Sequence, residues 1–288
     1  MDDGDVPCWA LVLGYRACRA FCGGRMTPVK RDRKGIPFYS EHDIERIAER
    51  FLRKVAPQCL TRPIRLPIFR IVRQLQMEGW FQYVAADLGE DYLGAYHLTQ
   101  KILYVHKSLL EGDPRLAFTV AHELGHFYLH RNIDPEVFRD RQAEMPPADL
   151  VDLAEDDQII LDSPREIVMG RFQGDNPRSI LEWQANRFAG AILVPSSTLE
   201  TALVAVQRHI GINRHLGVVW LTNQRGSYAD FYSTIRILAE RYETSQSVVR
   251  IRLYSLGLVR EQGIPVPLRR LGDVVGEALN DLFSGRNH

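Results

Sequence analysis

The segment His122-Glu123-Leu124-Gly125-His126 constrains this chain more than any other feature. It lies inside a stretch with clear helix signals, because Asp113 is a good N-cap residue and Pro114 suits the first helical position. We therefore predict one helix from Pro114 to about His130. At 3.6 residues per turn, positions 122 and 126 lie about 40° apart on one face, so their two imidazoles can reach the same metal ion.

The glutamate of this segment has a different direction from the histidines. Glu123 is turned roughly 100° from His122, which places its carboxylate beside the open position of a bound ion. There it can act as a general base toward a water molecule. The alternative is two ordinary surface histidines that flank a glutamate. The neighbours Phe118 and Leu124 are apolar, so histidines here would be desolvated and would need a partner. His130 lies one turn further along and is not expected to be a ligand.

A second helix offers a third ligand. Asn176-Pro177 repeats the cap signature, and Pro195 ends the helix. Glu182, Asn186 and Ala189 share one face of it, so the Asn186 amide can support a ligating carboxylate one turn away. Two histidines, one glutamate and a water form an open catalytic zinc site. The spacing alone fits a solvated surface glutamate equally well.

Two longer motifs resemble the ImmA/IrrE family of zinc metallopeptidases. Residues 118–130 read FTVAHELGHFYLH, similar to the family core FTxAHELGHxxLH, and residues 182–195 are similar to its segment ExxANxFAxxLLxP. The resemblance implies an α+β fold with a gluzincin-like metallopeptidase core, in which a small sheet packs on the motif helix. It also implies one bound Zn²⁺, with three protein ligands and a general base: His122, His126 and Glu182 for the metal, and Glu123 for the base.

The chain divides into three predicted regions. Residues 1–39 form an N-terminal extension and linker, residues 40–210 the metallopeptidase-like domain, and residues 211–288 a mainly helical C-terminal region. We expect a protein that begins at Met26 to fold and to keep its activity.

An acidic insertion interrupts the metallopeptidase-like domain. The two family motifs lie further apart here than is usual, and residues 131–175 hold twelve acidic side chains against five arginines. We predict that this segment is partly helical near residues 148–155 and lies beside the cleft.

Local patterns place further elements. Ser40 with Asp43 three residues later predicts a capped amphipathic helix, and a second helix follows over residues 68–79. Short strands are expected between residues 80 and 106, with 93–98 and 102–105 forming a β-hairpin. An extended peptide could pair with the edge of that hairpin.

The C-terminal region has the sequence pattern of a helix-turn-helix. Two helices are expected on either side of the turn at residues 243–245, similar to the tail common in the ImmA/IrrE family. A DNA-reading helix exposes several cationic or amide side chains, whereas the second helix offers only Gln246, Arg250 and Arg252. We therefore expect a helix-turn-helix-like annex that packs or docks, and no direct nucleic-acid binding.

Composition limits the remaining choices. The chain has 36 basic and 36 acidic residues with 45% hydrophobic and 25% charged residues, which is typical of globular proteins and gives no surplus charge for nucleic acid. No apolar run approaches the roughly 20 residues that cross a bilayer. Asp2, Asp3 and Asp5 stand where a secretory signal needs positive charge. We expect a cytoplasmic protein with reduced cysteines and no membrane partner.

These patterns predict a zinc-dependent endopeptidase that makes a specific cut in a partner protein. The resemblance implies that the partner is a helix-turn-helix transcriptional repressor of a mobile-element, stress or defence operon. The alternative is a non-proteolytic binding protein, of the antitoxin or anti-repressor type, that retains the metallopeptidase fold. The intact set of ligands with Glu123 favours the peptidase, because a pure binder has no need of a general base.

Overall fold

The computed structural model describes residues 30–31, 36–89, 92–109, 113–133, 159–162 and 177–262. The first 25 residues and the helix expected near 148–155 lie outside this part of the chain. The elements in chain order are β1 (Lys30–Arg31), β2 (Pro37–Phe38), α2 (Glu41–Val55), the 3-10 helix η1 (Pro57–Leu60), α3 (Ile68–Met77), β3 (Gln82–Ala86), β4 (Gly94–His97), β5 (Ile102–His106), α4 (Pro114–His130), β6 (Ile159–Asp162), α7 (Pro177–Leu193), α8 (Ser196–His209), β7 (Val219–Thr222), α9 (Arg225–Tyr242), α10 (Gln246–Ser255) and β8 (Val259–Gln262).

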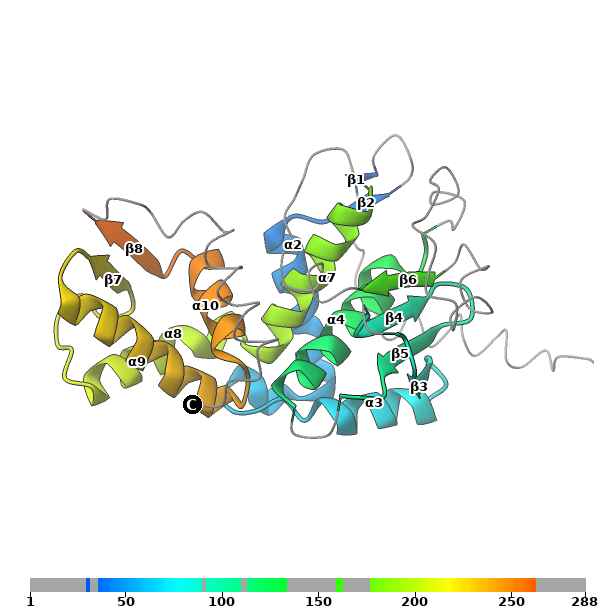
Figure 1. Cartoon of the computed structure of the whole chain (residues 1–288), viewed down its shortest axis with the longest axis horizontal. Helices are drawn as coiled ribbons and strands as arrows, with labels where there is room; N and C mark the ends of the chain where they lie inside the picture. The colour runs from blue at the N-terminus through cyan, green and yellow to red at the C-terminus, as the bar shows by residue number, and fades with distance from the viewer. Residues whose placement is uncertain are drawn as a thin grey trace, which may run out of the picture.

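Helices α4 and α7 pack against each other in the middle of the fold (Figure 1). Strands β4 and β5 contact α4, and α2 contacts α7. The sheet therefore lies on one side of the helix pair, and the C-terminal helices α9 and α10 lie on the other (Figure 1). The described residues form a mixed α+β structure, as predicted.

Helix α2 begins with the predicted capping box. Ser40 Oγ accepts a hydrogen bond from the Asp43 backbone N–H at 3.2 Å, and Asp43 Oδ2 accepts from the Ser40 N–H at 3.3 Å. The apolar residues at helical spacing face the core, as the pattern predicted: Ile44, Ala48, Phe51 and Leu52 are buried. The other predicted helix of this region is present as α3, and the chain leaves it through Gly79 at a positive φ of 76°.

The predicted hairpin is the centre of a four-stranded sheet with the order β3-β5-β4-β6. Strands β4 and β5 pair antiparallel, with His97 opposite Ile102 and Gly94 opposite Val105. Strand β3 joins β5 in parallel. The side of β5 away from β4 is thus already paired.

Strand β6 was not predicted. It lies within the acidic insertion, after the residues 148–155 where a helix was expected, and pairs antiparallel with β4, with Gly94 opposite Asp162 and His97 opposite Ile159. A run as short as Ile159–Asp162 carries no local sign of its partner, since pairing is decided by tertiary context. The hairpin edge that was expected to hold an extended peptide is therefore occupied in this structure by the chain itself.

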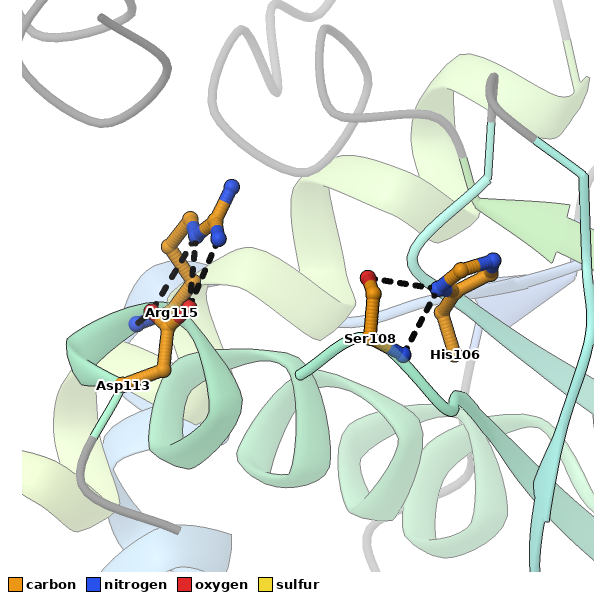
Figure 2. Close-up of polar contacts among 4 residues, drawn as sticks. All are labelled: His106, Ser108, Asp113 and Arg115. Carbon is orange, nitrogen blue, oxygen red and sulfur yellow. Dashed lines mark hydrogen bonds and ion pairs between the residues drawn. The ribbon is translucent and has the colours of Figure 1, made fainter. Parts of the chain in front are cut away.

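Short polar contacts lie at the end of β5 and at the start of α4 (Figure 2). Asp113 caps α4 by accepting from the Arg115 N–H at 2.8 Å, and its carboxylate also pairs with the Arg115 guanidinium at 2.6 Å. At the end of β5, His106 Nδ1 lies 2.7 Å from Ser108 Oγ and 3.1 Å from the Ser108 backbone N. The predicted cap therefore fixes where the motif helix starts.

The motif helix approaches α7 very closely at one point. A Cβ at Gly125 would lie 2.9 Å from Ala185 Cα and 3.0 Å from the Ala185 carbonyl oxygen. Only glycine at this position lets the two backbones come so near. The close approach brings side chains from α4 and α7 within reach of one another across the interface.

The C-terminal helices are docked on the core. As predicted, α9 and α10 flank a short turn. Glu243 in this turn has a left-handed backbone conformation, and Ser245 is the N-cap of α10. Arg252 is buried, and its guanidinium pairs with Glu45 of α2 while its Nε–H donates to the Val194 carbonyl oxygen at 2.9 Å. Arg250 is also buried. Two of the three polar residues considered for DNA reading thus face the protein, in line with a packing role.

The C-terminal region also contains a small sheet that the helical pattern did not predict. Strands β7 and β8 pair in parallel, with Val219 opposite Val259. Among the described residues, no single helix is both long and apolar enough to cross a bilayer; one bent pair, Ser179–Leu193 with Ser196–His209, meets the length and composition criteria only when the two are taken together.

Candidate metal centre

The donor atoms of three buried side chains converge between α4 and α7. His122 and His126 come from α4 and Glu182 from α7, and each is at most 3% exposed. The two histidine Nε2 atoms are 2.9 Å apart. Glu182 Oε2 lies 3.2 Å from His122 Nε2, and Glu182 Oε1 lies 3.6 Å from His126 Nε2. The structure thus brings together the three residues that were predicted as metal ligands.

These separations suit a tetrahedral metal ion. Nitrogen and oxygen ligands bind such an ion at about 2.0–2.2 Å, which places neighbouring ligands of a tetrahedron about 3.3 Å apart. The three measured separations lie on both sides of that value. The group can therefore hold a metal ion. Three protein ligands would leave the fourth position of the tetrahedron for a water molecule.

The electrostatics of the site favour a cation. Burial alone raises the pKa of the Glu182 carboxyl, but the charges and hydrogen bonds of His126 and His122 outweigh it and hold that pKa well below its ordinary value. Glu182 is therefore ionised at neutral pH. A buried carboxylate is costly unless positive charge compensates it, and a bound metal ion would supply that charge in place of the histidine protons.

Asn186 lies where a supporting residue was predicted. It stands one turn after Glu182 on α7, and its Oδ1 is 2.9 Å from His122 Nδ1. An amide oxygen only accepts, so the His122 Nδ1–H donates to it, and Nε2 is the ring atom that lies near Glu182 and could bind a metal ion. In a neutral ring this is the tautomer that a metal ligand requires.

Glu123 is packed directly against the backbone of β4. It is fully buried, and a Cβ at Gly94 would overlap its Oε1 atom and lie 2.9 Å from its Cδ. The same Cβ would lie 2.9 Å from Thr119 Cγ2. The contact of Gly94 with Glu123 was not predicted from the sequence, because a glycine in a strand does not indicate which side chain packs against it.

His130 and Gln184 also adjoin the site, and sequence reasoning did not assign them a role. His130 is not among the converging donors, but its Nδ1 lies 3.0 Å from His126 Nδ1. Burial and the neighbouring His126 hold the pKa of His130 well below its ordinary value, so this ring is neutral at neutral pH. The spacing of four residues between His126 and His130 on one helix could have indicated this contact from the sequence.

Comparison with known proteins found a family model that matches part of the chain. Residues 83–155 match the model of the IrrE N-terminal-like domain, which belongs to peptidase family M78. The chain carries an IrrE N-terminal-like domain. The match confirms the predicted relationship to the ImmA/IrrE family and includes His122, Glu123 and His126. It ends before Glu182, so the place of Glu182 in the site comes from the geometry.

Other comparisons are weaker. No curated protein matches this chain. Among solved structures, a Mycobacterium tuberculosis transcriptional regulator is similar at 18% identity with a TM-score of 0.41, over 89% of this chain and 54% of the other. The chain thus spans about half of that protein's length, and the likeness is too low to indicate a shared function.

Proposed function

We propose that this protein is a zinc-dependent endopeptidase that makes a specific cut in a partner protein. The observation that carries the proposal is the convergence of His122, His126 and Glu182. Both histidines and Glu123 lie on α4, inside the segment that matches the peptidase-family model. We further propose that the metal is a single Zn²⁺, since two imidazoles and one carboxylate are the ligands of a known class of catalytic zinc sites.

Each residue has a defined task in this proposal. A zinc ion held by His122, His126 and Glu182 would polarise the scissile carbonyl and would make a nearby water more acidic. Glu123 accepts the proton of that water as the water attacks the carbonyl carbon, and then delivers the proton to the leaving amine nitrogen. Asn186 holds His122 in the required tautomer. The burial of Glu182 and Glu123 keeps their carboxylates fixed before the substrate arrives.

Gly94 provides a test of how strictly Glu123 must be placed. Gly94→Ala forces the Glu123 carboxylate away from its position, because the new methyl group would overlap Oε1. A misplacement of about 1 Å at a catalytic group costs on the order of 100-fold in rate, and we expect a loss of that size with zinc content unchanged. The matched control is Gly226→Ala in α9, where a Cβ meets no atom within 4 Å. Equal activity in the two variants would contradict this role of Gly94.

We propose a DNA-binding repressor as the partner. The predicted insertion has a net formal charge of 5 − 12 = −7, which would attract the basic surfaces that such repressors use for DNA. Incubation with casein and with the repressor encoded nearest to this gene tests this: we expect one discrete cut in the repressor, blocked by a chelator, and little cleavage of casein. Association should slow as salt rises. Efficient, salt-independent digestion of casein would contradict a selective enzyme.

The sheet supports a proposal for where the peptide binds. Strand β4 carries Gly94 against Glu123, so a chain that pairs with β4 lies near the general base. Strand β4 pairs with β5 on one side and with β6, at the edge of the sheet, on the other. We propose that β6 occupies the edge that an extended substrate takes, and that it leaves this edge when the partner binds.

Weakening β6 should therefore increase cleavage. Replacing Ile159, Ile160, Leu161 and Asp162 with alternating glycine and serine removes β-propensity, and we expect several-fold faster cleavage of an unstructured peptide. The matched control replaces Ile159, Ile160 and Leu161 with valine, which retains the strand and should leave the rate unchanged. An unchanged or reduced rate in the glycine-serine variant would show that β6 is not in the way of the substrate.

A further inference from the structure

We propose that His130 and Gln184 are positioning residues that fix the tautomer of His126 through a relay of hydrogen bonds anchored on the backbone of β2. This inference rests on the proposed metal-dependent function, in which His126 must present Nε2 as a ligand. His126, His130 and Gln184 are all fully buried, so bulk water does not compete for their hydrogen bonds.

The relay begins at the Pro37 carbonyl oxygen. Gln184 Nε2 lies 2.9 Å from that oxygen, and a carbonyl oxygen only accepts, so the amide group of Gln184 must donate there. This fixes which end of the Gln184 side chain is which. Its Oε1 atom, an acceptor, then lies 3.3 Å from His130 Nε2. His130 therefore carries a proton on Nε2.

The second half of the relay passes from His130 to His126. A neutral imidazole with its proton on Nε2 has an acceptor at Nδ1. His130 Nδ1 is 3.0 Å from His126 Nδ1, so His126 must donate its Nδ1–H to complete the bond. The lone pair of His126 then lies on Nε2, which is the atom that faces His122 Nε2 and Glu182.

The direction of every bond thus follows from one backbone carbonyl. In the other tautomer of His126, the two Nδ1 atoms would be two buried acceptors in contact, and a proton would stand on Nε2 where the metal binds. His122 reaches the same state more simply, by donating to Asn186 Oδ1. The relay also gives a role to residues just before α2, since Pro37 is part of β2.

Two variants remove the relay at different points. His130→Phe eliminates the acceptor next to His126, and Gln184→Met eliminates the acceptor next to His130 while keeping a similar shape. Metal ligands that lose such outer partners bind their ion about 10–100-fold more weakly, and we expect a weakening of that size for both variants in a zinc competition titration. His130→Asn can place its Oδ1 near the former Nδ1 and should restore most of the affinity.

The matched control is His97→Asn. His97 is also buried, on β4, and its Nδ1 accepts from the Gln100 N–H at 3.3 Å, outside the relay. This variant should bind zinc as the unmodified protein does. A purely structural role for His130 predicts instead that His130→Asn and His130→Phe bind zinc equally, which would overturn the proposal.

A second readout does not need the metal. The ¹⁵N chemical shifts of His126 in the metal-free protein report which ring nitrogens carry a proton, and we expect Nδ1 to be fully protonated in the unmodified chain and only partly protonated in His130→Phe. If the unmodified protein shows the Nδ1–H form but binds no zinc, the proposed function fails while the relay stands. If it binds zinc and the His126 tautomer is the same in His130→Phe, the relay is wrong and the proposed function stands.

Discussion

Glu123→Gln is expected to abolish cleavage while zinc remains bound. The amide keeps the shape of the side chain beside Gly94, but it cannot accept the proton of the attacking water. General acid-base catalysis contributes about 100- to 10,000-fold, and the lost rate should be at least of that order. Single-turnover cleavage of the partner, followed on a gel, measures the effect.

The control for this variant is its metal content. Glu123 is not among the donors that converge on the candidate site, so zinc measured by elemental analysis should stay at about one equivalent. Cleavage at the unmodified rate would remove Glu123 from the mechanism. A loss of zinc together with activity would instead indicate that Glu123 helps to hold the metal.

Glu182→Ala is expected to lose most of the bound zinc, and His122→Ala should do the same. Either change removes one of three ligands, and Glu182→Ala also removes the negative charge that the buried site retains at neutral pH. Elemental analysis after dialysis should then find far less than one equivalent. Activity should fall in parallel with the metal.

A carboxylate elsewhere in the fold separates this effect from general damage. Glu45 is partly buried and pairs with Arg252, so Glu45→Ala should lower the melting temperature but leave the zinc content near one equivalent. Full zinc content in both Glu182→Ala and His122→Ala would mean that the ion, if any, is held elsewhere.

The elements that carry local signals were predictable from the sequence. Ser40 with Asp43 and Asp113 with Pro114 mark helix starts that the structure confirms, because capping is decided within a few residues. The two histidines of α4 could be placed on one face by helical geometry alone. Glu182 could be placed on a helix face but not opposite the histidines, since that depends on how α7 crosses α4.

The features that the sequence did not reveal depend on contacts between distant segments. Strand β6 is recognisable only by its pairing with β4, and Gly94 matters only because Glu123 crosses it. The role of His130 depends on Gln184, 54 residues away, and on the Pro37 carbonyl oxygen, 147 residues from Gln184. None of these contacts leaves a periodic or local pattern in the chain.

The most direct test of the proposed activity is mass spectrometry of the partner repressor after incubation with three forms of the protein: zinc-loaded, chelator-treated and Glu123→Gln. We predict two complementary fragments, from cleavage of one peptide bond, with the zinc-loaded form alone. Tight binding of the intact repressor by all three forms, with no fragment from any of them, would contradict the peptidase and support a protein that only sequesters its partner.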